Sequence, residues 1–285
     1  MRSIGSLDSS WPLGRRMRLD AHGRTDRGKA RDVNEDNFAI ATVRRTVTME
    51  LTSLAASANR DMGLSEAHVL IVADGVGGLA GGELASAMTV ETIIGQLGQL
   101  PIAANGADPD AENDFIGAIE RLAHRAHALI QETYGAPGRA PATTLTMVVL
   151  SWPRAYYVHV GDSRAYYLHR GRLRQLTRDQ TTGDYAVDLG IMTEEKARKA
   201  GLFNRLSSAI GAELTSSAGL IDLDDADVLL LCTDGLTKHV TDDQIADVLR
   251  LPAPSPEKTA RLLQRALDAG GSDNVTAIVA QVAEA

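Results

Sequence analysis

Short apolar runs bounded by glycine, aspartate or proline recur along the chain, and their order restricts the fold more than any other feature. Runs rich in β-branched and aromatic residues predict strands. Several of them cluster within 143–177 with no helix between them, and the helical segments come in pairs. A doubly wound parallel sheet needs strands and helices to alternate, so this order favours an α+β fold of antiparallel sheets with helices packed outside. The predicted strands are 37–43, 68–73, 143–151, 155–160, 164–169, 172–177, 227–232 and 274–282.

The helical segments carry clear local signals. In 111–134, apolar residues recur at the i, i+3, i+4 spacing of an amphipathic helix. A second helix is predicted over 82–99, directly after a glycine-rich loop. Thr241 with Gln244 predicts a capping box before a third helix. A serine and a proline begin a fourth, over 255–270, which ends at a glycine.

The domain organisation follows from length and from the absence of a clear linker. A chain of 285 residues is long enough for two domains, but layered sandwiches of this size often form one. We predict a loose N-terminal tail over 1–18 and a single domain over 19–285. Residues 44–67 are expected to form an inserted hairpin or loop. Residues 178–219, called the flap below, are predicted to hold one short helix near 193–200. The rest of the flap is rich in turn residues, and a connection of this length is usually functional or mobile.

Composition restricts the partners and the compartment. The formal net charge of −8 argues against broad binding to the phosphate backbone of nucleic acid. No apolar run reaches the ~18 residues of a membrane span, so no membrane partner is expected. The single cysteine, Cys232, allows no intrachain disulfide and fits a cytoplasmic location. It ends an apolar run, which predicts a buried, unreactive thiol.

Acidic residues stand at the ends of five predicted strands. The runs VLIVADG and VLLLCTDG share one pattern and end at Asp74 and Asp234, each followed by glycine. A third apolar run ends at Asp162. Asp273 precedes the last predicted strand, and Asp36 follows Glu35 at the start of the first. If these five strand ends meet, an oxygen-rich pocket results.

Charge repulsion decides what such a pocket can do. Several carboxylates brought together either acquire raised pKa values or need cations to neutralise them. Ligands that are all oxygen select Mg²⁺ or Mn²⁺ over zinc, and two such ions about 3.5–4 Å apart can activate water and stabilise phosphoryl oxygens. Taken singly, however, an Asp-Gly pair after a strand is usually a turn. Sequence spacing does not show whether the five aspartates meet.

The glycine-rich loop at 75–80 invites a different interpretation, because it matches the G-x-G-x-x-A fingerprint of dinucleotide sites. In such a site the pyrophosphate lies over the N-terminus of the next helix. Asp74 would place a negative charge against it. The following ~20 residues also predict a helix and not a second strand with a ribose-binding acid. The dinucleotide interpretation is therefore weak.

Six motifs together resemble one known family, the bacterial type 2C (PPM family) metal-dependent Ser/Thr protein phosphatases. They occur in the family's order and span roughly residues 22–282. The motifs are TDRGKARDVNEDNF (25–38), VADGVGGLAGGELAS (72–86), ATTLTMVVL (142–150), VGDSRAYYLHRGRLRQLTRDQT (160–181), CTDGL (232–236) and GGSDNVTAIV (270–279).

The resemblance implies an α-β-β-α sandwich of two antiparallel sheets flanked by helices, with a site for two core Mg²⁺ or Mn²⁺ ions at one end. It also implies a role for each matched residue. Asp74 would bridge the two ions, and the Gly75 carbonyl would bind one of them; Asp234 and Asp273 would bind the first ion, and Asp36 would hold the second. Asp162 with Asp234 would serve a weaker third ion. Arg31 would hold the substrate phosphate, and Asn274 would help to order metal-bound waters.

The implied reaction is hydrolysis of phosphoserine and phosphothreonine in proteins by metal-activated water, without a phospho-enzyme. The implied partners are phosphorylated proteins, such as a Ser/Thr protein kinase or its substrates, whose signalling the enzyme would oppose. Val76 stands where some members have a histidine proposed as general acid. Two alternatives remain open, a non-catalytic phosphoprotein-binding module and a hydrolase of small phosphorylated metabolites.

Overall fold

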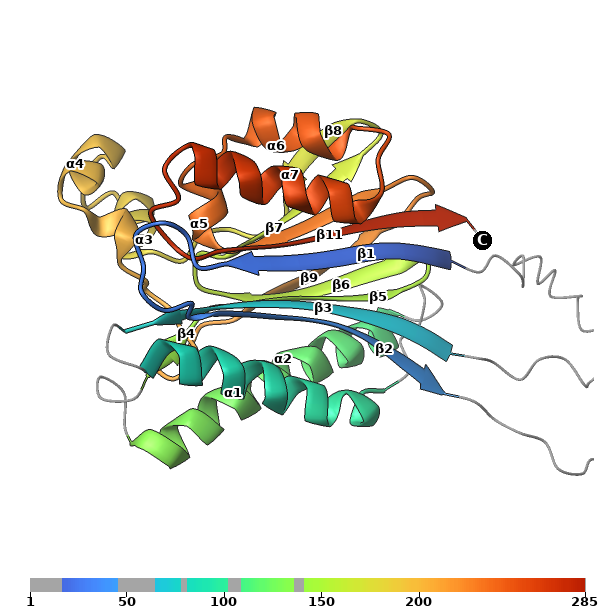
Figure 1. Ribbon diagram of the computed structural model, residues 1–285. Helices are drawn as coiled ribbons and strands as arrows, with labels where there is room; N and C mark the ends of the chain where they lie inside the picture. The colour runs from blue at the N-terminus through green and yellow to red at the C-terminus, as the bar shows by residue number, and fades with distance from the viewer. Residues whose placement is uncertain (1–16, 46–64, 78–80, 102–108, 136–140, 285) are drawn as a thin grey trace, which may run out of the picture.

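Two antiparallel sheets lie face to face with helices on both outer surfaces in the computed structural model (Figure 1). It describes residues 17–45, 65–77, 81–101, 109–135 and 141–284. The first sheet has the strand order β1-β11-β10-β7-β8, and the second has β2-β3-β5-β6-β9, with β4 beside β3. All of these neighbouring strands pair antiparallel. The expected α-β-β-α sandwich is confirmed.

The strands of the first sheet are β1 (Met17–Asp26), β11 (Val275–Glu284), β10 (Val228–Cys232), β7 (Arg164–His169) and β8 (Arg172–Gln175). Those of the second are β2 (Asp36–Arg45), β3 (Ser65–Val76), β4 (Ala142–Thr143), β5 (Leu145–Ser151), β6 (Arg154–Val160) and β9 (Ser217–Asp222).

Two long helices cover the second sheet, and the C-terminal helices cover the first (Figure 1). The flap helices α3 and α4 extend beyond one end of both sheets. The helices are α1 (Gly81–Gln96), η2 (Leu97–Gln99), α2 (Pro109–Tyr134), α3 (Thr182–Asp188), α4 (Glu194–Lys199), η3 (Leu202–Asn204), α5 (Asp234–Thr237), α6 (Asp242–Leu249) and α7 (Ser255–Asp268).

The central strands are buried on both faces, which explains their uninterrupted apolar sequence. In β10, Leu229 and Leu231 pack between the two sheets, whereas Leu230 packs on the other face, against the C-terminal helices. This alternation follows from the two-residue period of a strand. Cys232 also lies on the helix-covered face, where burial raises the pKa of its thiol to about 12. The predicted buried, unreactive cysteine is confirmed.

All eight predicted strands are present, with small shifts at their ends, but β1 and β9 were not predicted. Few residues of β1 are apolar, and only Leu19 and Ala21 of this strand pack against the core. It becomes a strand by pairing along its full length with β11, about 250 residues away in the chain. No local pattern encodes such a partner.

The prediction of one helix in the flap is wrong, because α3 precedes α4 there. The hydroxyl of Thr181 caps α3 by accepting a hydrogen bond from Asp184 N.

Of the expected tail, residues 1–16 lie outside the described residues, and Met17 already belongs to β1. Most of the expected insertion, 46–64, also lies outside them.

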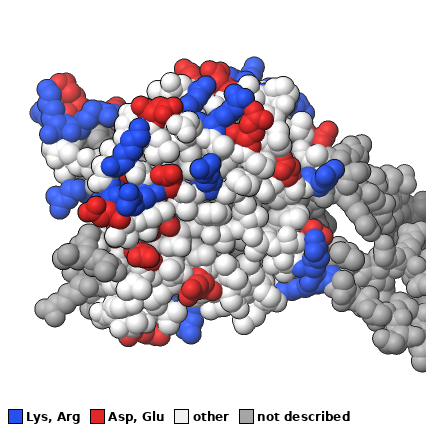
Figure 2. All heavy atoms as spheres, in the orientation of Figure 1, with Lys and Arg blue, Asp and Glu red and all other residues white. Residues whose placement is uncertain are grey.

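The surface shown in Figure 2 mixes both charge signs. Basic and acidic side chains lie beside one another over the helices, and the middle of this face is mainly uncharged. This face therefore offers no broad basic area. Within the described ranges, no helix is long and apolar enough to cross a lipid bilayer.

Candidate active site

Antiparallel pairing brings the five aspartates to one end of the sandwich. Asp36 at the start of β2 lies directly opposite Asp74 near the end of β3. Asp234 follows β10, and Asp273 precedes β11, the antiparallel neighbour of β10. Asp162 lies in the turn between β6 and β7. In an antiparallel pair, the last residues of one strand lie beside the first residues of its partner, so both come to the same end of the sheet.

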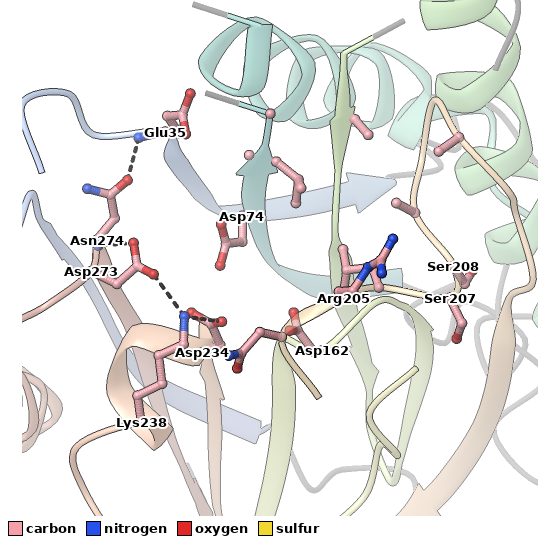
Figure 3. Close-up of a pocket in the computed structure, with 18 of the residues that line it drawn as sticks. Glu35, Asp74, Asp162, Arg205, Ser207, Ser208, Asp234, Lys238, Asp273 and Asn274 are labelled. Carbon is pink, nitrogen blue, oxygen red and sulfur yellow. Dashed lines mark hydrogen bonds and ion pairs between the residues drawn. The ribbon is translucent and has the colours of Figure 1, made fainter. Parts of the chain in front are cut away.

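A cavity of about 510 Å³ opens at this end. Asp74, Asp162, Asp234 and Asp273 line it, and residues 204–209 of the flap line part of its wall. Figure 3 shows Ser207 and Ser208 on the side of the cavity away from Asp273 and Asn274. The predicted convergence of the strand ends is therefore present in the tertiary structure.

The inner carboxylates of the cavity destabilise one another. Burial raises the pKa of Asp36 to about 7, with further contributions from Asp234 and Asp273, although hydrogen bonds from Thr276 and Thr233 lower it. Burial followed by the charges of its neighbours raises the pKa of Asp74 well above its ordinary value. Burial and Asp234 raise the pKa of Asp162 to about 7. Like charges in a poorly hydrated site oppose ionisation, so this group of carboxylates needs positive charge.

Asp273 differs from the inner carboxylates because it carries its own cations. Burial alone would raise its pKa, but hydrogen bonds from Arg31 and Lys238 outweigh burial and lower it. Arg31 Nε lies 2.7 Å from Asp273 Oδ1, and Arg31 Nη2 donates to Oδ2 at 2.9 Å. Lys238 Nζ lies 2.8 Å from Oδ2.

Two carboxylate oxygens are buried without a hydrogen-bond partner, Asp36 Oδ1 and Asp234 Oδ1. Asp36 Oδ2, in contrast, accepts hydrogen bonds from Thr233 Oγ1 at 2.8 Å and from Thr276 Oγ1 at 2.7 Å. A buried anionic oxygen with no partner is costly, and it fits a hard cation well. No three acidic, histidine or cysteine side chains of the described chain form a ready-made cage for an ion. Metal binding would therefore draw the carboxylates closer together.

The motif Ala142-Thr143-Thr144 fixes the backbone of Asp74. Asp74 N donates to Thr144 Oγ1 at 2.9 Å, and Asp74 O accepts from Thr144 N at 2.9 Å and from Thr143 Oγ1 at 2.8 Å. Both threonines are fully buried. The carboxylate of Asp74 thus projects from a rigid backbone, which favours a preorganised site.

Gly75, near the end of β3, is required where three backbone segments approach closely. A Cβ added there would lie 2.4 Å from Gly82 C and O and 2.7 Å from Glu35 O. Because these contacts are with backbone, Gly75→Ala is expected to lower the free energy of unfolding by about 2 kcal/mol and to weaken Mn²⁺ binding.

Urea unfolding and calorimetry measure the two effects of Gly75→Ala. Gly95→Ala in α1 is the matched control, since a Cβ there meets nothing within 4 Å. That control should leave Mn²⁺ binding unchanged and stabilise the exposed helix by up to ~1 kcal/mol. Equal stability of the two variants would contradict the close approach of these backbones.

The two residues expected to have catalytic roles, Arg31 and Asn274, are both engaged with the protein. Arg31 forms the bidentate ion pair with Asp273 described above, and half of its side chain remains exposed. Asn274 Nδ2 donates to Arg27 O and Val33 O at 2.9 Å each, and its Oδ1 accepts from Glu35 N at 2.8 Å. Asn274 thereby ties the loop before β2 to the start of β11. Its role in ordering waters stays a prediction, and it would use the remaining lone pair of Oδ1.

Three further residues shape the site and were not predicted. Lys238 contacts two of the aspartates, and its position four residues after Asp234 in a short helix was a readable signal for an ion pair. Asp179 binds Arg164 through three hydrogen bonds of 2.7, 2.8 and 3.1 Å. Gln180 Oε1 accepts from Gly161 N at 2.9 Å, which fixes the turn that carries Asp162. No sequence pattern indicated the last two contacts.

Comparison with known proteins finds relatives that match most of this chain. The profile of a family described as Protein phosphatase 2C matches residues 59–279. The serine/threonine protein phosphatase PstP of Mycobacterium tuberculosis is 33% identical over 246 residues, which cover 86% of this chain and 46% of that protein. This chain therefore spans about half the length of that relative. The protein phosphatase PhpP of Streptococcus pneumoniae is 31% identical over 223 residues, covering 76% of this chain and 86% of PhpP.

Solved structures show the same fold. The catalytic domain of PstP, in complex with two manganese ions, superposes with a TM-score of 0.67 at 31% sequence identity. The match covers 94% of this chain and all of that domain. A relative with this fold thus binds manganese.

Proposed function

The chain belongs to the protein phosphatase 2C family, and from that premise we propose that it hydrolyses phosphoserine and phosphothreonine in proteins with bound Mg²⁺ or Mn²⁺. One observation carries the proposal. Five aspartates from both sheets gather at one end of the sandwich, four of them line the cavity, and two buried carboxylate oxygens of this group have no hydrogen-bond partner. A phosphate-binding module without catalysis has no need for such an arrangement, because repulsion among the carboxylates destabilises the fold.

The residues of this site fit two core ions held by carboxylates. Asp74, which has four acidic neighbours, would be a ligand shared by the ions, and Asp36 Oδ1 and Asp234 Oδ1 would each serve one of them. Gly75 O and Asp273 would complete the ligands. A third, weaker ion would use Asp162. When bound, such ions supply activated water and neutralise charge on the phosphoryl oxygens.

The protein's own groups would place the substrate. The guanidinium of Arg31, half exposed at the rim of the cavity, is suited to bidentate binding of phosphate oxygens. Thr233 and Thr276 hold one oxygen of Asp36 and so fix the direction of the other. Val76 lines the cavity and has no proton to donate. The proton for the departing serine or threonine oxygen must therefore come from water or another group.

The proposed partners are phosphorylated proteins. The relatives PstP and PhpP are named protein phosphatases, and residues of the flap line part of the cavity beside the aspartates. A Ser/Thr protein kinase or its substrates, and a cytoplasmic location, stay predictions from the sequence.

The test is hydrolysis by the purified chain. We expect Mn²⁺ to accelerate phosphate release from a phosphothreonine peptide and from p-nitrophenyl phosphate by more than ~100-fold over the chelated protein, because the ions supply several kcal/mol. The value of kcat/KM for the peptide should exceed that for a sugar phosphate by at least about ten-fold. Preference for the sugar phosphate would favour the metabolite hydrolase. Peptide binding with no turnover would favour the binding module.

A further inference from the structure

Lys238 belongs to the carboxylate cluster through ion pairs with two of its members. It follows the short helix α5, one turn after Asp234. Its Nζ lies 2.6 Å from Asp234 Oδ2 and 2.8 Å from Asp273 Oδ2, so one ammonium group joins two carboxylates from different segments (Figure 3). A pair between residues four apart in a helix is common at protein surfaces. The contact with Asp273, 35 residues further along the chain, has no such local explanation.

The positive charge of the protein is distributed unevenly over this cluster. Arg31 and Lys238 both contact Asp273, and Lys238 also contacts Asp234. In the described part of the chain, no ion pair to Asp36, Asp74 or Asp162 is formed. Five carboxyl groups against two cations leave three of the carboxyl groups without an ion-pair partner. Arg31 and Lys238 thus neutralise the edge of the cluster formed by Asp234 and Asp273. The other three carboxyl groups need positive charge from another source.

Asp234 shows how a resident cation and an incoming ion would meet. One of its oxygens, Oδ2, is held by Lys238, while Oδ1 is buried and has no hydrogen-bond partner. An ion that binds Oδ1 comes within a few ångströms of the ammonium group. Two positive charges at such a distance repel strongly where water is scarce. Side-chain exposure of 39% gives Lys238 room to swing outward.

We propose that Lys238 is a resident counter-ion that competes with divalent cations for Asp234 and Asp273. This inference rests on the metal-dependent function proposed above. Lys238 holds the cluster together when divalent ions are scarce, and ion binding has to displace or repel its ammonium group. The metal affinity is therefore lower than the carboxylates alone would give, and the enzyme responds to the concentration of free metal.

The test is Mn²⁺ binding to the full chain, stripped with a chelator and measured by titration calorimetry. Lys238→Gln keeps a long polar side chain and removes the charge. We expect the variant to bind Mn²⁺ on the order of ten-fold more tightly, because one nearby positive charge is gone. Without metal, its melting temperature should fall below that of the wild type, since Asp234 and Asp273 lose their shared cation. Saturating Mn²⁺ should remove this difference.

Two matched variants separate the local charge from other effects. Lys199→Gln removes the same charge from an exposed pair with Glu195 in the flap, where Nζ and Oε1 are 2.6 Å apart. It should leave the Mn²⁺ affinity within two-fold of the wild type. Lys238→Arg keeps the charge and should also stay near the wild type, although the shape of the side chain changes.

The outcomes distinguish this inference from the proposed function. Unchanged or weaker Mn²⁺ binding by Lys238→Gln, with binding intact in the wild type, would overturn the competition. If the wild type binds Mn²⁺ but does not dephosphorylate the peptide, the phosphatase function fails while the competition stands. Failure of every variant to bind Mn²⁺ would overturn both.

Discussion

Replacing Asp74 with asparagine is expected to abolish metal-dependent phosphate release while making the metal-free protein more stable. Asp74 is the carboxylate that all four other aspartates of the cluster influence, and it lies directly opposite Asp36. Removing its charge eliminates the central ligand, so kcat/KM should fall by about 10³-fold or more. Removing the same charge relieves repulsion, so the melting temperature measured in chelator should rise. A variant that merely misfolds would show the opposite change in stability.

Asp247→Asn is the control for this experiment. Asp247 lies on α6, two thirds of its side chain is exposed, and it forms an ion pair with Arg250. Its loss should leave both activity and melting temperature nearly unchanged, because exposed pairs contribute little. Retention of Mn²⁺-dependent hydrolysis by Asp74→Asn would remove the basis for the proposed function.

The stability of the metal-free protein is expected to fall as pH rises from about 4 through about 7. Asp36 and Asp162 have pKa values near 7 in the folded state against about 3.8 when unfolded. Over this range the folded state binds more protons than the unfolded state, so each rise in pH favours unfolding. A shift of about three pH units corresponds to at most ~4 kcal/mol for one carboxylate. Because the pKa values of both groups also depend on the charge of Asp234, ~2 kcal/mol is a realistic size for one of them.

Buried His159 acts in the opposite direction. Burial lowers its pKa to about 4, so the stability that it contributes is lost as the pH falls below about 6. A comparison between the wild type and Asp162→Asn cancels this contribution, because His159 is present in both. In chelator, the variant should gain about 2 kcal/mol over the wild type between pH 5 and pH 8 in urea unfolding.

Manganese should reverse the order of the two proteins. Ions bind the ionised carboxylates, so their stabilisation grows with pH and depends on an intact ligand set. The wild type in Mn²⁺ should then be at least as stable as Asp162→Asn at pH 8. A difference between the two proteins that does not depend on pH in chelator would show that Asp162 does not titrate near neutrality.

The elements of the fold that could be predicted are those whose amino-acid sequence is determined by burial alone. Strands buried on both faces must be apolar throughout, and β3, β5 and β10 therefore stand out in the sequence. The edge strands β1 and β9 and the flap helix α3 escaped prediction because pairing or capping, and not composition, makes them regular. Strand β1 depends on β11, and α3 depends on a single capping threonine in a turn-rich segment.

The identities of the site residues were also readable, because six ordered motifs narrow the family. The separate function of each of these residues was harder to predict from the sequence. Asn274 illustrates the difference, since its amide ties the loop before β2 to the start of β11. A role of this kind depends on atoms 240 residues apart and leaves no local pattern.

The sequence by itself determined the class of fold, the family and the acidic residues at the strand ends, because apolar burial and motif order are local properties of the chain. Only the tertiary structure decided that these acids meet, that Asp36 and Asp74 face each other, and that Lys238 stands between Asp234 and Asp273. The physical reason is that electrostatic energy depends on distance in space. Register and the packing of two sheets set that distance, and sequence spacing does not record it.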